Sequence, residues 1–147
     1  MKIYDCFMFY DEDLVVDLRL NILNKYVDEF IIVESKFTHS GEKRELLFNI
    51  NKYSNFKNKI NYITLDSEPY NLEKITNSDT EDKTNSKYIM NALKRENFQR
   101  NEITKGLTKA NTEDLILISE VDEITNLSNL NINQVNNEIE LYKQKIK

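Results

Sequence analysis

Four short apolar runs interrupt an otherwise polar chain, at residues 3–9, 30–33, 60–65 and 115–118. Each is rich in aliphatic or aromatic side chains and too short for a helix, which is typical of buried β-strands. The last run, Leu115–Ile118, is uniformly aliphatic. It therefore predicts a strand in the middle of a sheet.

Helical spacing of apolar residues marks the segments between the strands. The first predicted helix follows the acidic residues 11–13, which suit a helix N-terminus, and ends near Tyr26. Its expected core positions are Leu14, Leu18 and Ile22, with Val15 and Leu23 beside them. Further helices are predicted over 45–53 (Leu46, Leu47 and Ile50 on one side), over 86–110 (Ile89, Leu93, Ile103 and Leu107 as core) and over 126–147. Residues 66–85 are polar and contain Pro69, which predicts a long loop.

Strands that alternate with helices predict an α/β fold, with a mainly parallel sheet and helices on both faces. In such sheets ligands bind beyond the carboxyl ends of the strands. Acidic residues follow all four predicted strands here. A binding site is therefore expected where these strand ends meet.

Composition narrows the class of protein. The 147 residues suffice for one domain, and the interspersed charges, with a net charge of −5, do not form the basic surface that a nucleic-acid partner requires. Cys6, the only cysteine, lies in an apolar run and is predicted to be a buried thiol. No apolar run approaches the roughly 20 residues of a membrane span, and no signal peptide is evident. We expect a soluble, cytoplasmic protein.

The segment after the fourth strand, Ser119-Glu120-Val121-Asp122-Glu123, holds three carboxylates. If it stays extended, Glu120 and Asp122 project from the same side. Such hard oxygen donors suit Mg²⁺ or Mn²⁺, and a divalent cation balances the charge of a departing diphosphate. The alternative is a solvated or helix-capping acidic cluster.

Other polar residues near the strand ends have two interpretations each. Glu34 is either a ligand for the nucleobase or ribose of a nucleotide, or a cap for the loop that follows it. His39 is either a ligand or an exposed loop residue, and as the only histidine it cannot form a histidine-based metal site or a Ser-His-Asp triad within this chain. Arg100 either contacts a diphosphate or pairs with Glu96 one helical turn away. Arg19 is expected to be structural, paired with a strand-end carboxylate.

Several of these segments together resemble glycosyltransferase family 17, the β-1,4-mannosyl-glycoprotein β-1,4-N-acetylglucosaminyltransferases. The resemblance covers nearly the whole chain in order. It is carried by residues 4–12, 17–20, 27–35, 38–39, 96–101 and 118–124. Two positions depart from the family pattern: Glu120 stands where an aspartate is usual, and Thr125 where a proline is usual.

The resemblance implies a GT-A fold of which residues 1–147 form the Rossmann-like nucleotide-sugar-binding part, incomplete at the C-terminus. It also implies an inverting transfer of a sugar, N-acetylglucosamine in the best-known members, from a UDP-sugar donor to a glycan acceptor, with Mn²⁺ or Mg²⁺ as cofactor. The expected metal ligands are Glu120 and Asp122. The expected nucleotide-sugar contacts are Glu34, Thr38, His39, Arg100, Asn101 and Glu123. The general base is expected beyond Lys147.

Two rival interpretations stay open at this point. A truncated or degenerate relative would bind a nucleotide, or nothing, without catalysis. A receiver-type phosphoacceptor would use Asp11 or Asp13 for Mg²⁺ and Asp66 for the phosphoryl group, although no lysine follows a fifth strand as that class requires.

Overall fold

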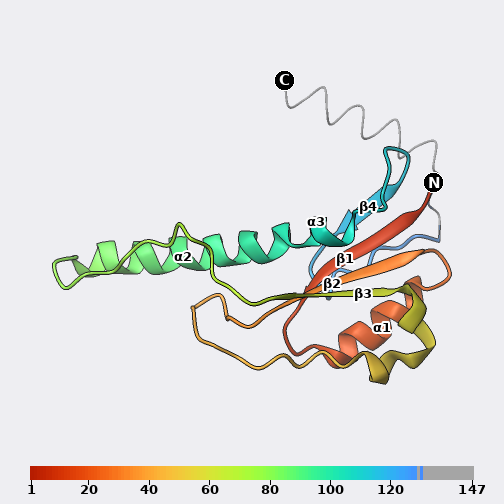
Figure 1. Ribbon diagram of the computed structural model, residues 1–147, viewed down its shortest axis with the longest axis horizontal. Coiled ribbons are helices and arrows are strands. Elements are labelled where there is room, and N and C mark those ends of the chain that lie inside the picture. The colour runs from red at the N-terminus through yellow and green to blue at the C-terminus, as the bar shows by residue number, and fades with distance from the viewer. Residues whose placement is uncertain (129, 131–147) are drawn as a thin grey trace.

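The computed structural model of the protein describes residues 1–128 and 130 (Figure 1). Its elements in chain order are β1 (Ile3–Phe9), α1 (Asp13–Leu23), β2 (Glu29–Ser35), the 3₁₀ helix η1 (Ile50–Lys59), β3 (Ile60–Leu65), α2 (Glu81–Asn101), α3 (Ile103–Gly106) and β4 (Leu115–Ile118). The four strands form one parallel sheet, which confirms the predicted fold class. The helix predicted over 126–147 falls almost entirely outside the described residues.

The strand order is β3-β2-β1-β4. β2 and β3 are added in turn on one side of β1, and β4 is then added on the other side of β1. The most apolar strand, β4, is therefore an edge strand, and the prediction that it lies centrally is wrong. Among residues 1–128 and 130, β1 alone pairs with it, and Ile118 is 53% exposed. The central position was predicted from hydrophobicity alone, whereas the place of a strand in the sheet depends on how the connections between strands run.

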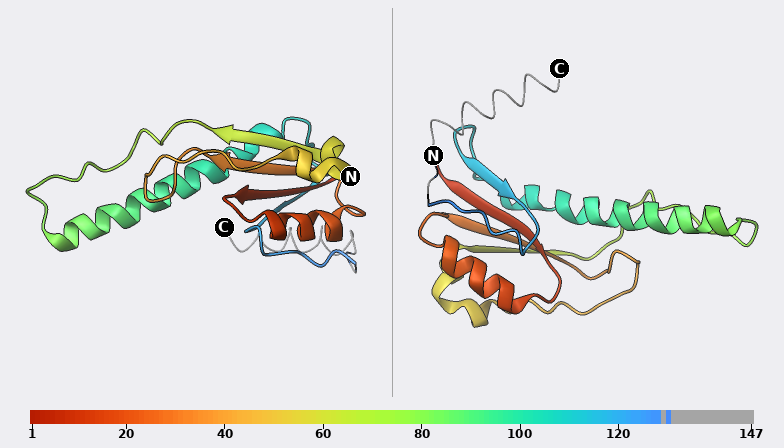
Figure 2. Two further views of the ribbon diagram at one scale, coloured as in Figure 1. Left: turned by 90° about the horizontal axis from the view of Figure 1, so that it is seen from below. Right: turned by 180° about the vertical axis from the view of Figure 1, so that it is seen from behind.

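Alternating side chains of β1 and β2 serve two separate cores, one on each face of the sheet. Phe7 and Phe9 face the side covered by α1 and η1, whereas Tyr4 and Cys6 face the side covered by α3 (Figure 2). The buried thiol predicted at Cys6 is confirmed. On the second face Gly106 permits close packing, since a Cβ there would lie 2.7 Å from Cγ2 of Ile31.

Helix α1 buries a different stripe from the one that the sequence predicts. Leu14, Leu18 and Ile22 are exposed, and the inward positions are Val16, Arg19, Leu20 and Leu23. Both stripes have helical spacing, and the buried one contains an arginine. Arg19 can occupy a core position because Asp5, in the middle of β1, pairs with it there.

The helix predicted over 45–53 is not formed; η1 begins only at Ile50. The backbone N–H groups of Leu47 and Phe48 donate to the carboxylate of Glu34, which holds this stretch away from helical geometry. Residues 44–49 therefore have no regular secondary structure, and Glu34 ties them to the end of β2.

The long helical segment begins five residues earlier than predicted, at Glu81, where the Thr80 side chain accepts a hydrogen bond from Lys83 N. Its predicted core positions Ile89 and Leu93 are exposed, because this half of α2 projects beyond the sheet (Figure 1). Ile103, in α3, is buried as predicted. None of the helices in the described part of the chain is long and apolar enough to cross a membrane.

Candidate functional site

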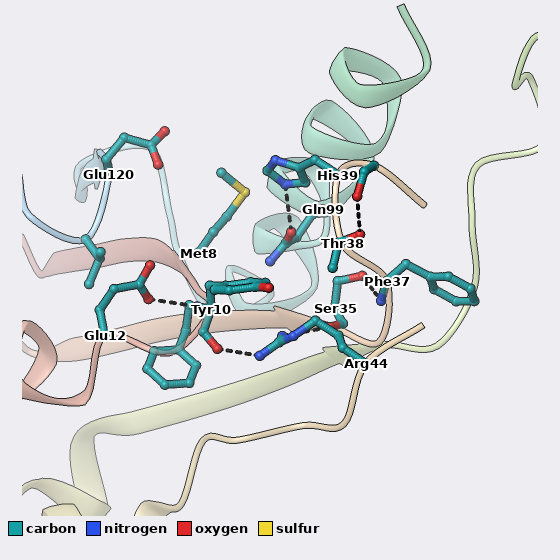
Figure 3. A pocket seen from close by; sticks show the side chains of 13 residues that line it. Met8, Tyr10, Glu12, Ser35, Phe37, Thr38, His39, Arg44, Gln99 and Glu120 are labelled. Atoms are coloured by element: carbon teal, nitrogen blue, oxygen red, sulfur yellow. Dashed lines mark hydrogen bonds between the residues drawn. The ribbon is translucent and has the colours of Figure 1, made fainter. Parts of the chain in front are cut away.

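A pocket of about 430 Å³ lies beyond the carboxyl ends of β1 and β2 (Figure 3). Three segments that are distant in sequence enclose it: the loop after β2, the C-terminal half of α2 and the turn after β4. Its polar lining consists of Tyr10, Glu12, Ser35, Thr38, His39, Ser40, Arg44, Gln99 and Glu120. A cavity therefore lies at the strand ends, where the sequence predicts a binding site.

The pocket owes its shape to the unequal lengths of β1 and β4. β4 ends at Ile118, level with Cys6, whereas β1 continues to Phe9. The turn after β4 therefore begins beside the last residues of β1, and Glu120 and Val121 become one wall of the cavity. This point between β1 and β4 is also where the strand order reverses, the usual binding crevice of an open parallel sheet.

A tight loop after β2 forms the opposite wall. Phe37 and Lys43 form a β-bridge, and the hydroxyl of Thr38 accepts a hydrogen bond from the backbone N–H of Glu42. The turn needs glycine at position 41, where φ is +96° and a Cβ would meet the guanidinium of Arg95 at 2.6 Å. The sequence places Thr38 and His39 at the tip of this loop, which explains why both reach the pocket.

Gln99, on α2, connects this loop to the sheet. Its amide nitrogen donates to the carbonyl oxygen of Val33 at 3.1 Å, and its oxygen lies 3.3 Å from Nε2 of His39. Arg95 donates to the carbonyl oxygen of His39 from the next turn of the helix. Helix α2 thereby fixes both the backbone and the ring of His39 at the pocket.

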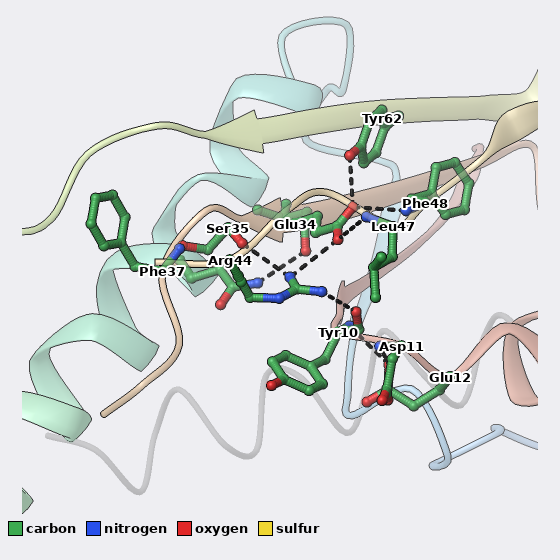
Figure 4. A network of polar contacts seen from close by, with 12 residues as sticks. Tyr10, Asp11, Glu12, Glu34, Ser35, Phe37, Arg44, Leu47, Phe48 and Tyr62 are labelled. Atoms are coloured by element: carbon green, nitrogen blue, oxygen red, sulfur yellow. Dashed lines mark hydrogen bonds and ion pairs between the residues drawn. The ribbon is translucent and has the colours of Figure 1, made fainter. Parts of the chain in front are cut away.

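Glu34 and Arg44 form a buried polar network behind the pocket (Figure 4). The Glu34 carboxylate accepts hydrogen bonds from Leu47 N, Phe48 N and the hydroxyl of Tyr62, at 2.7, 3.0 and 2.7 Å. Arg44 pairs with it at 3.1 Å. Burial, and then the hydrogen bond to Glu34, raise the pKa of the Tyr62 phenol. The arrangement is the loop cap that the second interpretation of Glu34 described, and none of its side chain is exposed.

Arg44 also links the two strand ends that carry the pocket. Its guanidinium donates to the carbonyl oxygens of Ser35 and Tyr10 and lies 4.3 Å from the centroid of the Tyr10 ring. The ring of Tyr10 is half exposed at the cavity. Arg44 was not among the residues predicted from the sequence, although it is the only arginine between the second and third strands.

The acidic segment after β4 is a turn. The backbone N–H of Glu123 donates to the carbonyl oxygen of Glu120 at 3.0 Å, and the carboxylate of Glu123 accepts from Glu120 N at 3.1 Å. The segment is therefore not extended, and the condition under which Glu120 and Asp122 project from the same side is not met. Glu120 points toward the cavity, whereas Asp122 is exposed on the turn and does not line it.

A comparison with family models identifies the class of the protein. The model of glycosyltransferase family 17 matches residues 1–143. The chain belongs to glycosyltransferase family 17. Neither the curated proteins nor the solved structures gave a significant match. Family 17 membership implies transferase activity, with a sugar donor and an acceptor as substrates.

Of the remaining residues predicted to act in a site, some lie near this pocket and others do not line it. Arg100 pairs with Glu96 at 2.8 Å, as the second interpretation proposed, and also with Glu120 at 2.9 Å. Asn101 ends α2 on an exposed surface and does not line the pocket. Asp66, the phosphoacceptor of the rival interpretation, forms an exposed pair with Lys36, away from the cavity.

The donor set of the acidic turn limits the kind of metal site that it can form. Within residues 1–128 and 130, no three His, Cys, Asp or Glu side chains converge as a metal cage. Glu120 is half exposed at the pocket wall and already paired with a cation, Arg100. Mg²⁺ and Mn²⁺ are commonly held by one or two carboxylates together with substrate phosphates. The residues present fit a cation shared with a diphosphate and do not fit a site built from protein groups alone.

Proposed function

We propose that this family 17 chain binds a nucleotide-sugar donor in the pocket between β1, β2 and the turn after β4. UDP-N-acetylglucosamine is the donor that the family resemblance favours, with a glycan hydroxyl as acceptor. One observation carries the proposal: in a chain of this family, three segments that are distant in sequence enclose a pocket at the point where the strand order reverses.

The proposal gives the pocket residues distinct roles. The half-exposed ring of Tyr10, backed by the guanidinium of Arg44, provides a flat surface on which a uracil ring can stack. Thr38 and His39 present hydrogen-bonding groups at the opposite wall, where a ribose or base edge would lie. We leave Glu34 out of the contacts, because all of its side chain is buried behind the pocket.

The acidic turn and Arg100 would receive the diphosphate. Glu120, which lines the pocket, would hold Mn²⁺ or Mg²⁺ together with oxygens of the diphosphate. The ion supplies positive charge to the leaving diphosphate when it is bound. The expected second ligand, Asp122, would have to turn toward the cavity to reach the same ion. Arg100 already lies 2.9 Å from Glu120, so its guanidinium is placed to contact a phosphate oxygen once Glu120 has another cation to bind.

Calorimetric titration of UDP, with and without Mn²⁺, tests the proposal. The doubly substituted protein Glu120→Gln/Asp122→Asn is expected to lose the affinity that Mn²⁺ adds. The control Glu113→Gln/Asp82→Asn removes the same charge from exposed acids that do not line the pocket, and should bind as the unsubstituted protein does.

A transfer assay then separates an enzyme from a binding module. Release of UDP from UDP-N-acetylglucosamine in the presence of a glycan acceptor supports the transferase. Tight binding without release supports the non-catalytic relative. Binding that is absent, or unaffected by both Mn²⁺ and the double substitution, contradicts the proposed site.

A further inference from the structure

Arg19 is a fully buried arginine that joins the core of the protein to the acidic turn. Its side chain and that of Asp5 are both 0% exposed, and Nη2 of Arg19 lies 2.7 Å from the nearer Asp5 oxygen. Nε donates to the other oxygen of Asp5 at 2.8 Å, and the guanidinium lies 4.7 Å from the centroid of the Phe7 ring. Asp5 therefore fixes one edge of the guanidinium within the sheet.

The remaining donors of Arg19 all reach the segment after β4. Nη1 donates to the carbonyl oxygens of Glu120, Val121 and Glu123, at 2.6, 3.0 and 3.3 Å. Nη2 also donates to the hydroxyl of Ser119 at 2.7 Å. That hydroxyl in turn donates to the carbonyl oxygen of Glu123 at 3.1 Å. One side chain thus bonds to four of the five residues of the acidic turn.

We infer that Arg19, held by Asp5, is a positioning residue that sets the backbone of residues 119–123 so that Glu120 faces the diphosphate and its cation. The inference rests on the proposed function of the pocket. It assigns Arg19 no contact with substrate, because the guanidinium is fully buried beneath the turn.

The direction of the carbonyl groups explains how this positioning works. Three carbonyl oxygens of the turn point inward at one guanidinium, which leaves the acidic side chains to point outward. Without that donor, the carbonyl of Val121 would lose its buried partner, and those of Glu120 and Glu123 would keep only Glu123 N and the Ser119 hydroxyl. The turn could then rotate these carbonyls toward water, and the carboxylates would move with them. Groups that orient metal ligands in this way commonly change metal affinity by about 10–100-fold when they are removed.

Lysine cannot replace the arginine at this position. A guanidinium presents five donors in a rigid plane, and here they bond to Asp5, Ser119 and three carbonyls at once. An ammonium group carries the same charge with only three donors at a single point. Arg19→Lys therefore keeps a charge for Asp5 but releases part of the turn.

The test compares Arg19→Lys with Val16→Ala, which lies on the same buried face of α1 and has no bond to the turn. Ser119→Ala, on the exposed side of the network, is a milder variant that removes one partner of Arg19. The variants and the unsubstituted protein are compared at urea concentrations at which their free energies of unfolding are equal. Two quantities are measured: hydrogen exchange at the amides of Glu123 and Ile124 in the absence of metal and nucleotide, and the affinity for UDP with Mn²⁺.

In Arg19→Lys we expect both amides to exchange faster than in Val16→Ala, and UDP with Mn²⁺ to bind about 10–100-fold more weakly. Ser119→Ala should show the same changes to a smaller degree, and Val16→Ala neither. Equal exchange and equal affinity in Arg19→Lys and Val16→Ala would overturn the inference and leave the proposed function intact. If the unsubstituted protein does not bind UDP with Mn²⁺, the proposed function fails, and the metal-positioning role fails with it.

Discussion

Removal of the Glu34 carboxylate is expected to destabilise the protein severely. Glu34→Ala leaves Arg44, which is only 10% exposed, without its ion-pair partner. It also leaves Leu47 N, Phe48 N and the Tyr62 hydroxyl without the acceptor that they share. The loop behind the pocket then loses its attachment to the end of β2.

The magnitude follows from the burial of both charges. Breaking a buried ion pair by removing one partner costs about 3–5 kcal/mol, because the remaining charge stays uncompensated. The total stability of a domain is roughly 5–15 kcal/mol, so Glu34→Ala is expected to remove a large part of it. Glu34→Gln keeps one acceptor oxygen and loses the charge, for which we expect a loss of about 1.5–3 kcal/mol.

Urea denaturation followed by circular dichroism measures these losses. Glu73→Gln is the matched control, since Glu73 pairs with Lys94 at a surface where it is 41% exposed, and such pairs contribute about 0–1 kcal/mol. In Glu34→Gln the pKa of Tyr62, followed by NMR of its ring, should also fall toward its ordinary value. A loss in Glu34→Ala no larger than in the control, with an unchanged Tyr62 pKa, would refute the account of this network.

Three further predictions concern stability and reactivity. Tyr4→Phe removes a buried hydroxyl that has no partner among the described residues, so the free energy of unfolding should rise by about 1 kcal/mol; a clear loss in urea denaturation would contradict this. Burial raises the pKa of the Cys6 thiol to about 12, so a thiol reagent should react only as fast as the protein unfolds, and rapid labelling of the folded protein would disagree. The hydrogen bond from Lys52, and a further one from Tyr53, lower the pKa of Asp13. The stability that the Asp13 carboxylate contributes is therefore present above the ordinary carboxyl pKa and is lost as the pH falls through the lowered pKa of Asp13. Asp13→Asn should make the free energy of unfolding depend less steeply on pH in this acid range. An unchanged pH dependence would contradict this prediction.

The sequence was sufficient to predict the strands and the location of a cavity. The four apolar runs all became parallel strands, and a cavity lies where the rule for strand ends puts it. Thr38, His39 and Glu120, named from loops after strands, line that cavity. The strands and the cavity could be predicted because they depend on local hydrophobicity and on one general property of parallel sheets. The binding roles of these three residues stay predictions.

The remaining features depend on pairs of residues that are distant in sequence. The structural pairing expected for Arg19 is confirmed, but its partner, Asp5, lies inside β1 and not at a strand end. The buried face of α1 was misjudged because the expected core positions were all apolar and did not include Arg19. An acid in the middle of an apolar strand was the signal that could have revealed this pair. Likewise, residues 47 and 48 are extended because Glu34 binds their backbone N–H groups, which no helical pattern in that segment could show.

The central claim is that a nucleotide diphosphate and a divalent cation bind between the loop after β2 and the turn after β4. Paramagnetic broadening of backbone amide signals by Mn²⁺ in the presence of UDP tests it most directly. The account predicts that broadening is strongest around Glu120 and extends to Thr38 and Tyr10, and that Mg²⁺ causes none. Broadening centred elsewhere, or spread over exposed acids such as Glu113 and Asp82, would contradict it.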